Sequence, residues 1–210
     1  TFIFTRIFQP QGQNYPLFVL CGLVPFSFFH VALMSGTSSL LDNASLIKRV
    51  PLPREVIPVA SVLSNVLHLL IQIGLLLALV MIFGAGPNRH WLWLPVVWGL
   101  EIVFVCGLVL VTAALNVFIR DTRYVVESGL TVLFWLVPIF YPFSVIPQEY
   151  RNVYQFNPVA AIVLALRSIL LEGQAPHPEL VFKLAAVSLG ALVVGWLAFR
   201  RLERRFYDYL

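Results

Sequence analysis

Long apolar segments alternate with short polar ones along nearly the whole chain. A helix needs about 20 apolar residues to cross the hydrocarbon core of a membrane. Five segments meet this requirement or come close to it, and we expect each to be a transmembrane helix: 17–34 with an end as late as 41, 56–83, 91–115, 125–141 and 180–199. A sixth apolar segment, 158–171, is too short to span and contains Arg167, so we expect a re-entrant or interfacial helix there.

The composition indicates that lipid surrounds much of the chain. Hydrophobic residues make up 60% and charged residues 11%, whereas soluble domains have about 45–50% apolar and about 25% charged residues. No polar block is long enough to form a separate soluble domain. We therefore predict an all-α polytopic membrane protein, in which residues 1–210 form a single transmembrane domain.

Basic residues are concentrated in alternate connections between the predicted spans. Because Lys and Arg are enriched on the cytoplasmic side of membrane proteins, we expect these connections and the C-terminus to be cytoplasmic. The position of the basic residues at the ends of apolar segments favours membrane topology over nucleic-acid binding, so we expect no nucleic-acid partner. These connections hold nine of the fourteen basic residues, namely Lys48, Arg49, Arg54, Arg120, Arg123, Arg200, Arg201, Arg204 and Arg205.

The loop between the first two spans has the pattern of a short, stiff helix. Asp42 or Asn43 can cap a helix at 44–50. Pro51 ends that helix, and Pro53 precedes the start of the second span. Two interpretations are weighed evenly: a basic loop that only anchors the topology, and a stiff element that docks on a cytoplasmic partner.

Charged residues at two further places have both a local and a functional interpretation. Arg120 and Arg123 flank Asp121 and either pair with it at a helix start or contact a partner. Glu101 lies in the third span, about 15 Å deep at 1.5 Å per residue. An intramembrane carboxylate is costly, so we expect it to face protein or a wet cavity and to have a function.

The chain has no motif for chemistry of its own. It contains no GxxxxGK[ST], HExxH or GxSxG sequence. Cys21 and Cys106 lack the spacing of metal ligands, and a packing role is favoured for the lone His30 and His68. We therefore expect no catalytic residue, metal site or cofactor in this chain, and no enzymatic activity.

Several stretches, all in the same order, resemble one family of membrane transporters. They are YPLFVLCGLVPFSFF at 15–29, LIKRVPLPREVIPVASVLSN at 46–65, ALNVFIRDTRYVVE at 114–127, FWLVPIFYPFSVIP at 134–147, Asn157 with Pro158, and FRRLERRF at 199–206. Together they resemble ABC transporter permeases of the type-two export family, in particular the branch that exports O-antigen, teichoic acid and capsular polysaccharide. That family has six spans and an amphipathic interface helix. Only TFIFTRIF resembles the end of the first span, so we expect the sequence to lack the rest of that span and the interface helix.

The resemblance implies a homodimer in the bacterial inner membrane, surrounded by membrane lipid. It also implies a cytoplasmic dimer of ABC ATPase subunits, which binds ATP and Mg²⁺. The helix at 44–50 would be the coupling helix to this ATPase, and the loop at 120–123 would be a second contact. The implied coupling residues are Ala44, Ser45, Leu46, Ile47, Lys48, Arg49, Val50, Arg54, Glu55, Arg120, Asp121 and Arg123.

The resemblance also implies an outer gate and a glycan path. Short outer helices correspond to 144–154 and 158–171, with gate residues Tyr141, Pro142, Tyr150, Asn157 and Pro158. The implied substrate is a polyprenyl-linked glycan, and aromatic rings can stack on sugars, although packing in the core explains each phenylalanine equally well. The candidate path residues are Phe26, Phe28, Phe29, Glu101 and Phe134.

Two alternatives remain open at this point. The nearest is a drug, haem or lipid exporter of the same superfamily. An alternative of a different class is a membrane-embedded glycosyltransferase or other enzyme.

Overall fold

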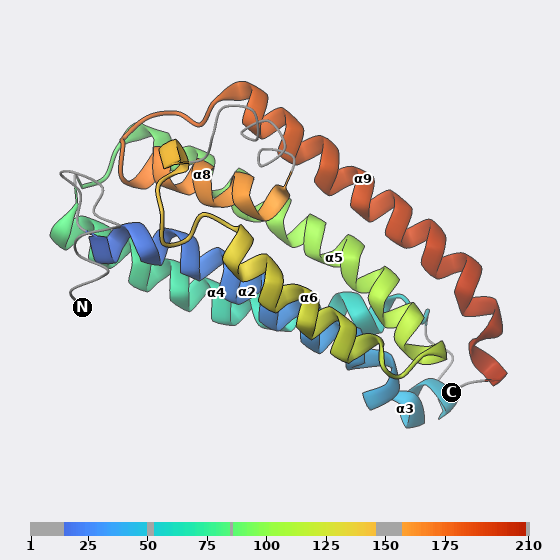
Figure 1. Ribbon diagram of the computed structural model, residues 1–210. Coiled ribbons are helices and arrows are strands. Elements are labelled where there is room, and N and C mark those ends of the chain that lie inside the picture. The colour runs from blue at the N-terminus through green and yellow to red at the C-terminus, as the bar shows by residue number, and fades with distance from the viewer. Residues whose placement is uncertain (1–14, 50–52, 85, 146–156, 209–210) are drawn as a thin grey trace.

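The computed structural model describes residues 15–49, 53–84, 86–145 and 157–208, without the side chains of residues 144, 207 and 208. In these ranges the chain forms helices joined by short turns, with no strand. The helices form one elongated bundle (Figure 1), which confirms the all-α prediction. The elements are α2 Tyr15–Asp42, α3 Ala44–Arg49, α4 Val56–Phe83, η1 Arg89–Trp93, α5 Leu94–Phe118, α6 Thr122–Leu136, η2 Phe143–Val145, α8 Pro158–Leu170, α9 Pro178–Leu202 and η3 Glu203–Asp208.

Four stretches are long and apolar enough to cross a membrane, judged by length and composition. Each covers one of the predicted spans. An apolar segment in lipid becomes a single helix, because a helix satisfies all backbone hydrogen bonds within the segment. α4 has the predicted bounds, and α2 continues past both predicted ends of the first span. The four stretches are Tyr15–Asp42, Val56–Phe83, Arg89–Phe118 and Pro178–Phe206.

The fourth predicted span, 125–141, is wrong in its extent. Helix α6 has 15 residues, which corresponds to about 22 Å at 1.5 Å per residue. It ends because Pro138 disfavours helical backbone at the residue before it, and Val137 is extended, with φ −72° and ψ 135°. Beyond Leu136 the chain continues as non-helical backbone to η2 (Figure 1).

The bundle is organised around α5, which packs against α2, α4, α8 and α9. α6 packs mainly on α2, on the side of the bundle away from α9. α5 and α9 run in the same direction along the bundle (Figure 1), because the chain returns through α6 and α8 between them.

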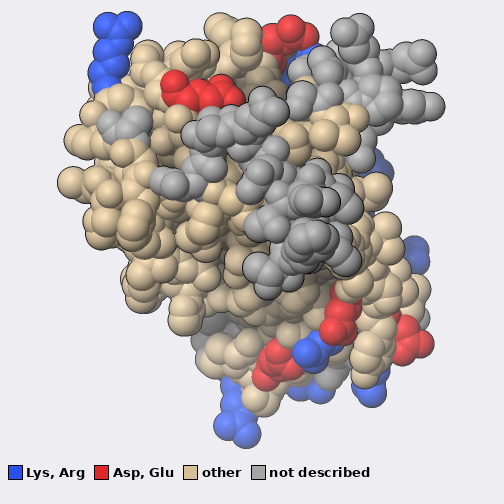
Figure 2. Space-filling model, turned by 60° about the vertical axis from the view of Figure 1, so that its left-hand side comes forward, with Lys and Arg blue, Asp and Glu red and all other residues tan. Residues whose placement is uncertain are grey.

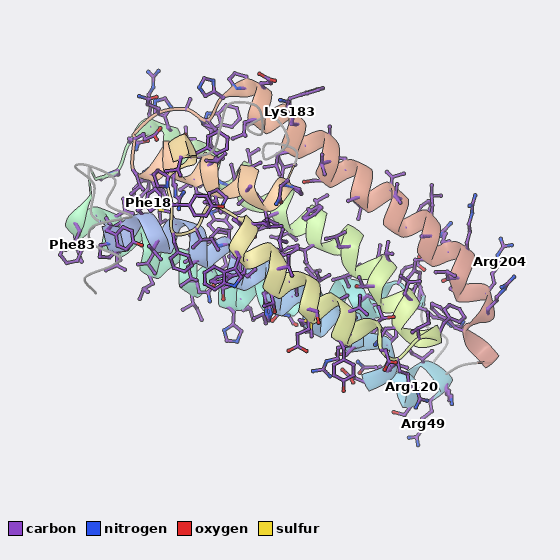
Figure 3. All side chains as sticks on the ribbon, in the orientation of Figure 1. Phe18, Arg49, Phe83, Arg120, Lys183 and Arg204 are labelled. Carbon is purple, nitrogen blue, oxygen red and sulfur yellow. The ribbon has the colours of Figure 1, made fainter. Side chains whose placement is uncertain are left out.

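The two ends of the bundle differ in charge. One end, here called the basic end, consists of α3, the turn between α5 and α6, and the junction of α9 with η3. Arg49, Arg120 and Arg204 lie at this end, whereas Phe18, Phe83 and Lys183 lie towards the opposite end (Figure 3). Figure 2 shows that charged side chains on one face gather mainly at the two ends, with a broad uncharged band between them. Such a band is the expected surface of a bundle that spans a membrane.

Helices α5 and α9 meet backbone to backbone. Gly107 of α5 faces Ala191 and Gly195 of α9. A Cβ atom added to Gly107 would lie 2.5 Å from the carbonyl carbon of Ala191, and one added to Gly195 would overlap the carbonyl of Gly107. Small residues four apart allow this close approach of helices in membranes. The contact therefore fixes the spacing of α5 and α9 and leaves no room for a larger side chain.

We expect Gly195→Ala to separate α9 from α5 and to lower the free energy of unfolding by about 1–3 kcal/mol, the usual cost of overpacking. Thermal unfolding of the purified protein in detergent measures the effect. Gly190→Ala on the same helix is the matched control, because a Cβ atom there meets nothing within 4 Å. Equal melting temperatures for the two variants would contradict the close contact.

Candidate functional site

Helix α3 lies at the basic end and presents an exposed, basic surface. None of its six residues is buried, and Lys48 and Arg49 occupy its last turn. Ala44 and Ile47 are half-buried, while Ser45, Leu46, Lys48 and Arg49 are exposed. Val50 lies outside the described residues. A short helix with this exposure has the form of an element that enters a groove on another protein.

A tight turn at Asn43 joins α3 to α2. The backbone carbonyl of Asn43 accepts hydrogen bonds from the N–H groups of Leu46 and Ile47, at 3.0 and 3.1 Å. Its side-chain amide donates to the Ser39 carbonyl of α2 at 2.8 Å. Asn43 thus occupies the N-cap position of α3 while its amide closes the end of α2, and side-chain capping by Asp42 or Asn43 stays a prediction. The turn nevertheless holds α3 close to the end of α2.

The second predicted contact region lies at the same end of the bundle (Figure 3). Arg120, Asp121 and Arg123 belong to the turn between α5 and α6, and all three are exposed. Among the ion pairs within the described ranges, none joins Asp121 to either arginine. The turn is closed instead by Thr122 Oγ1, which donates to the Ile119 carbonyl at 2.7 Å. All three charged side chains are thus exposed on the same end as α3.

Arg54 and Glu55 immediately precede α4 and are both half-buried. Arg54 Nη1 donates to the backbone carbonyl of Glu203 at 2.8 Å. Glu55 Oε1 lies 3.8 Å from Arg200 Nη2. The structure therefore places both residues against the C-terminal helix, and their contact with an ATPase stays a prediction.

The phenylalanines predicted to line a path pack together inside the bundle. Phe26, Phe28 and Phe29 of α2 are buried, and Phe134 of α6 is half-buried. The ring centroid of Phe26 lies 5.1 Å from that of Phe134, and Phe29 stacks on Phe104 of α5 at 5.9 Å. Contacts of this kind stabilise a core. A role in translocation stays a prediction, and it requires this cluster to open.

Glu101 is enclosed within the protein. Its side chain is 0% exposed, and neither carboxylate oxygen has a hydrogen-bond partner in the described structure. The indole N–H of Trp98, on the same helix, and the hydroxyl of Ser188, on α9, are also buried without a partner. Glu101 therefore faces protein rather than lipid, and it lies on no surface of this conformation.

At the end opposite to the basic end, α8 is a buried helix of 13 residues. Its length is about 20 Å, whereas the hydrocarbon core is about 30 Å thick. Asn157 caps the helix, because its Oδ1 accepts from the Val159 N–H at 3.1 Å, and Pro158 occupies the first turn. Beyond its end, Gly173 has φ 65°, which glycine adopts without strain. The short helix predicted at 158–171 is thus confirmed.

The other predicted gate residues lie in the connection that leads from α6 towards α8. Tyr141 and Pro142 are half-buried, and the Tyr141 hydroxyl donates to the Leu136 carbonyl at the end of α6, at 3.0 Å. Of the outer helix predicted at 144–154, only the end of η2 is described. Tyr150 lies outside the described residues, so the outer gate as a whole stays a prediction.

Arg167 holds α8 in place, a role that sequence reasoning missed. Its side chain is buried, and its guanidinium carbon lies 3.5 Å from the centroid of the Phe18 ring on α2. Nη2 donates to the Ile139 carbonyl at 2.7 Å and to the Phe18 carbonyl at 3.3 Å. Arg167 thereby joins α8 to α2 and to the extended chain after α6. The available signal was one arginine within an otherwise apolar helix.

A row of polar side chains along the seam between α2 and α4 was also missed. Ser61, Asn65, His68 and Gln72 recur at helical spacing on α4, and Asn65 Nδ2 donates to Ser35 Oγ of α2 at 2.9 Å. Three hollows of about 440, 200 and 310 Å³ follow this seam. They are open hollows at the surface where α2 meets α4. Nowhere in the described ranges, this seam included, is a group of three or more His, Cys, Asp or Glu residues placed to hold a metal ion.

We expect Glu101→Gln to keep or raise the free energy of unfolding, by up to about 1–3 kcal/mol, the cost of a buried polar group without a partner. The amide has nearly the shape of the carboxylate but avoids burying an unpaired charge. Thermal unfolding in detergent measures the change, with Glu127→Gln on exposed α6 as the control. A clear fall in melting temperature for Glu101→Gln alone would show that the carboxylate has a stabilising partner.

Known proteins similar to this chain are transport permeases. The chain matches the ABC-2 type transporter family over residues 1–171. It is 30% identical over 210 residues to the O-antigen export system permease protein RfbA of Klebsiella pneumoniae. The aligned region covers 100% of this chain and 81% of that protein. The protein of the same name from Myxococcus xanthus is 31% identical over 209 residues, with 99% and 79% covered.

A more distant relative has a different polysaccharide in its name. The polysialic acid transport protein KpsM of Escherichia coli is 24% identical over 191 residues, which cover 90% of this chain and 74% of that protein. The family resemblance seen in the sequence is confirmed by these matches. The chain belongs to the ABC-2 type transporter family of membrane permeases.

Proposed function

We propose that this chain is the membrane-spanning permease of an ATP-driven exporter that moves a polyprenyl-linked polysaccharide across the bacterial inner membrane. The observation that carries the proposal is α3, a short basic helix that is exposed at one end of a transmembrane bundle and joined closely to it. Such an element suits a transport subunit that is driven by a separate protein. The names of the relatives, for O-antigen and polysialic acid, support a polysaccharide as the substrate.

The basic end is the cytoplasmic end in this proposal. It carries nine of the fourteen basic residues of the chain, and Lys and Arg are retained on the cytoplasmic side during insertion. The C-terminus is then cytoplasmic, and α8 lies near the outer surface of the membrane.

The energy source is a cytoplasmic ABC ATPase dimer. Since this sequence has no phosphate-binding GxxxxGK[ST] loop, ATP and Mg²⁺ bind to the partner. α3 enters a groove on each ATPase, and the turn at 120–123 forms a smaller contact beside it. The groove is acidic in part, because Lys48 and Arg49 need compensation when they are desolvated.

Two copies of the permease form the transport unit, with α6 near their interface. Glu127, Ser128 and Thr131 are exposed on α6, next to the exposed Val132 and Trp135. The Thr131 hydroxyl is already bonded to the Glu127 carbonyl at 3.0 Å, but the Glu127 carboxylate is poorly suited to lipid contact. A second permease or a wet path beside this face satisfies that carboxylate better.

Reversal of charge on α3 tests docking of the ATPase. We expect Lys48→Glu combined with Arg49→Glu to weaken association at least about tenfold, because removing charge complementarity at a desolvated contact costs more than about 1.4 kcal/mol. Co-purification of the ATPase with the permease measures it, after membrane insertion has been verified.

The matched control for this variant reverses Arg201 and Arg205, which are exposed at the same end but outside α3. It should leave association unchanged. Undiminished co-purification of the α3 variant would remove the support for docking at this helix.

The substrate class is tested with the permease and its ATPase in proteoliposomes. We expect polyprenyl-pyrophosphate-linked glycan to raise ATP turnover and to appear, in an ATP-dependent manner, on the side of the membrane opposite the ATPase, where a lectin detects it. Haem, a hydrophobic drug or plain phospholipid should have neither effect. ATP-driven movement of one of these compounds, but not of glycan, would favour the alternative exporter of the same superfamily.

A further inference from the structure

The basic end of the bundle contains an apolar cluster of its own, separate from the main core. This cluster joins residues from α2, α3, α4, α5, α9 and η3, so it connects the base of α3 with the C-terminal helix. Its buried members are Leu40, Leu110, Ala113, Ala114, Val117, Phe199 and Phe206, and Ile47, Ile57, Val59, Phe118, Leu192 and Leu202 pack against it.

Phe206 lies at the centre of this cluster, although it is close to the end of the chain. Its side chain is 0% exposed. The ring meets Phe199 of α9 edge-on, with centroids 5.5 Å apart, and Phe118 of α5 with centroids 5.7 Å apart. A tail that served only as a basic anchor would not need a buried aromatic residue at this point. Phe206 therefore fixes η3 against α5 and α9.

Arg54 connects this C-terminal structure to the segment that leads from α3 into α4. Its Nη1 donates to the Glu203 carbonyl at 2.8 Å, and its guanidinium carbon lies 5.9 Å from the centroid of the Phe206 ring. Glu203 is the C-cap of α9 and the first residue of η3. A cation is favoured at a helix C-terminus. Arg54 thus binds the junction of α9 and η3 through both the Glu203 carbonyl and the Phe206 ring.

The two seams that leave the basic end differ in how closely the backbones of their helices approach. Along the seam between α2 and α4 there are hollows of about 440, 200 and 310 Å³. Along the seam between α5 and α9, by contrast, Gly107 and Gly195 are in backbone contact. The seam between α5 and α9 is therefore a close backbone contact through which a displacement at the basic end can pass.

We propose that Arg54 and Phe206 are positioning residues, which transmit the movement of α3 into α9 and thence into α5 and the outer helix α8. This inference rests on the proposed function. When the ATPase moves α3, Ile47 displaces the cluster against which Ile57 of α4 also packs, and the nearby Arg54 displaces the end of α9. α5 follows because it is in backbone contact with α9, and α8 follows because it packs on both helices.

The first experiment measures export per ATP hydrolysed in proteoliposomes with the ATPase. We expect Arg54→Gln and Phe206→Leu to retain ATPase docking and ATP turnover but to lower glycan export per ATP by about tenfold, within the usual range of coupling between sites. Arg54→Lys should restore part of the coupling, because Lys keeps one charged donor for the Glu203 carbonyl. Arg204→Gln is the matched control, exposed at the same end, and should behave as the parent.

A second experiment leaves Arg54 unchanged, so its result does not depend on how a substitution of Arg54 affects folding. Glu55 and Arg200, whose side chains approach to 3.8 Å, are replaced by cysteine in a protein whose Cys21 and Cys106 are changed to alanine. The new pair is then joined by a short thiol cross-linker. If the two segments move together, cross-linked permease should export as well as the uncross-linked protein.

The outcomes distinguish this inference from the proposed function. Export per ATP that is unchanged in Arg54→Gln, or export that is blocked by the cross-link, would overturn the inference while glycan export by the parent still stands. A parent complex that shows no ATP-driven glycan export would overturn the proposed function, and this inference with it.

Discussion

Every backbone N–H and carbonyl group within the apolar part of this bundle has to find its partner inside the protein, and this constraint governs the structure. It makes the backbone helical wherever lipid is the only neighbour. Some side chains add bonds between helices: Asn116 Nδ2 donates to the Thr37 carbonyl across the α2–α5 contact at 3.0 Å, and Arg167 reaches the carbonyls of Phe18 and Ile139. Polar residues therefore connect the helices at specific points, and apolar packing fills the space between them.

The long helices could be predicted from sequence because their length is set by the membrane rather than by contacts with other helices. α4, which runs over 56–83, shows this most directly. α6 could not be predicted in the same way, since its apolar run continues through Val137 and Pro138 to residue 141. The backbone leaves the helix at Val137, and the Ile139 carbonyl that is then left without a helical partner accepts from Arg167. Only the folded protein places that arginine there.

The candidate site shows the same limit. A cluster of basic residues and prolines was enough to locate α3, because capping and proline effects act over a few neighbouring residues. The contact between Arg54 and Glu203 joins residues far apart in the chain, and no local pattern reveals it. For Phe26 and Phe134, sequence left core packing and a sugar path equally open, and their ring contact at 5.1 Å depends on the arrangement of α2 and α6.

The shortness of α6 has a consequence for biosynthesis. With 15 residues, and with Glu127 among them, it falls short of the about 20 apolar residues that insert readily on their own, and a carboxylate near a helix centre opposes insertion by about 2.5–3.5 kcal/mol. We therefore expect α6 to enter the membrane against helices that are already there, among them α2, where the Phe26 ring contacts that of Phe134. In that order of events the earlier helices act as a template for the later one, and the bundle starts to assemble while the chain is still being made.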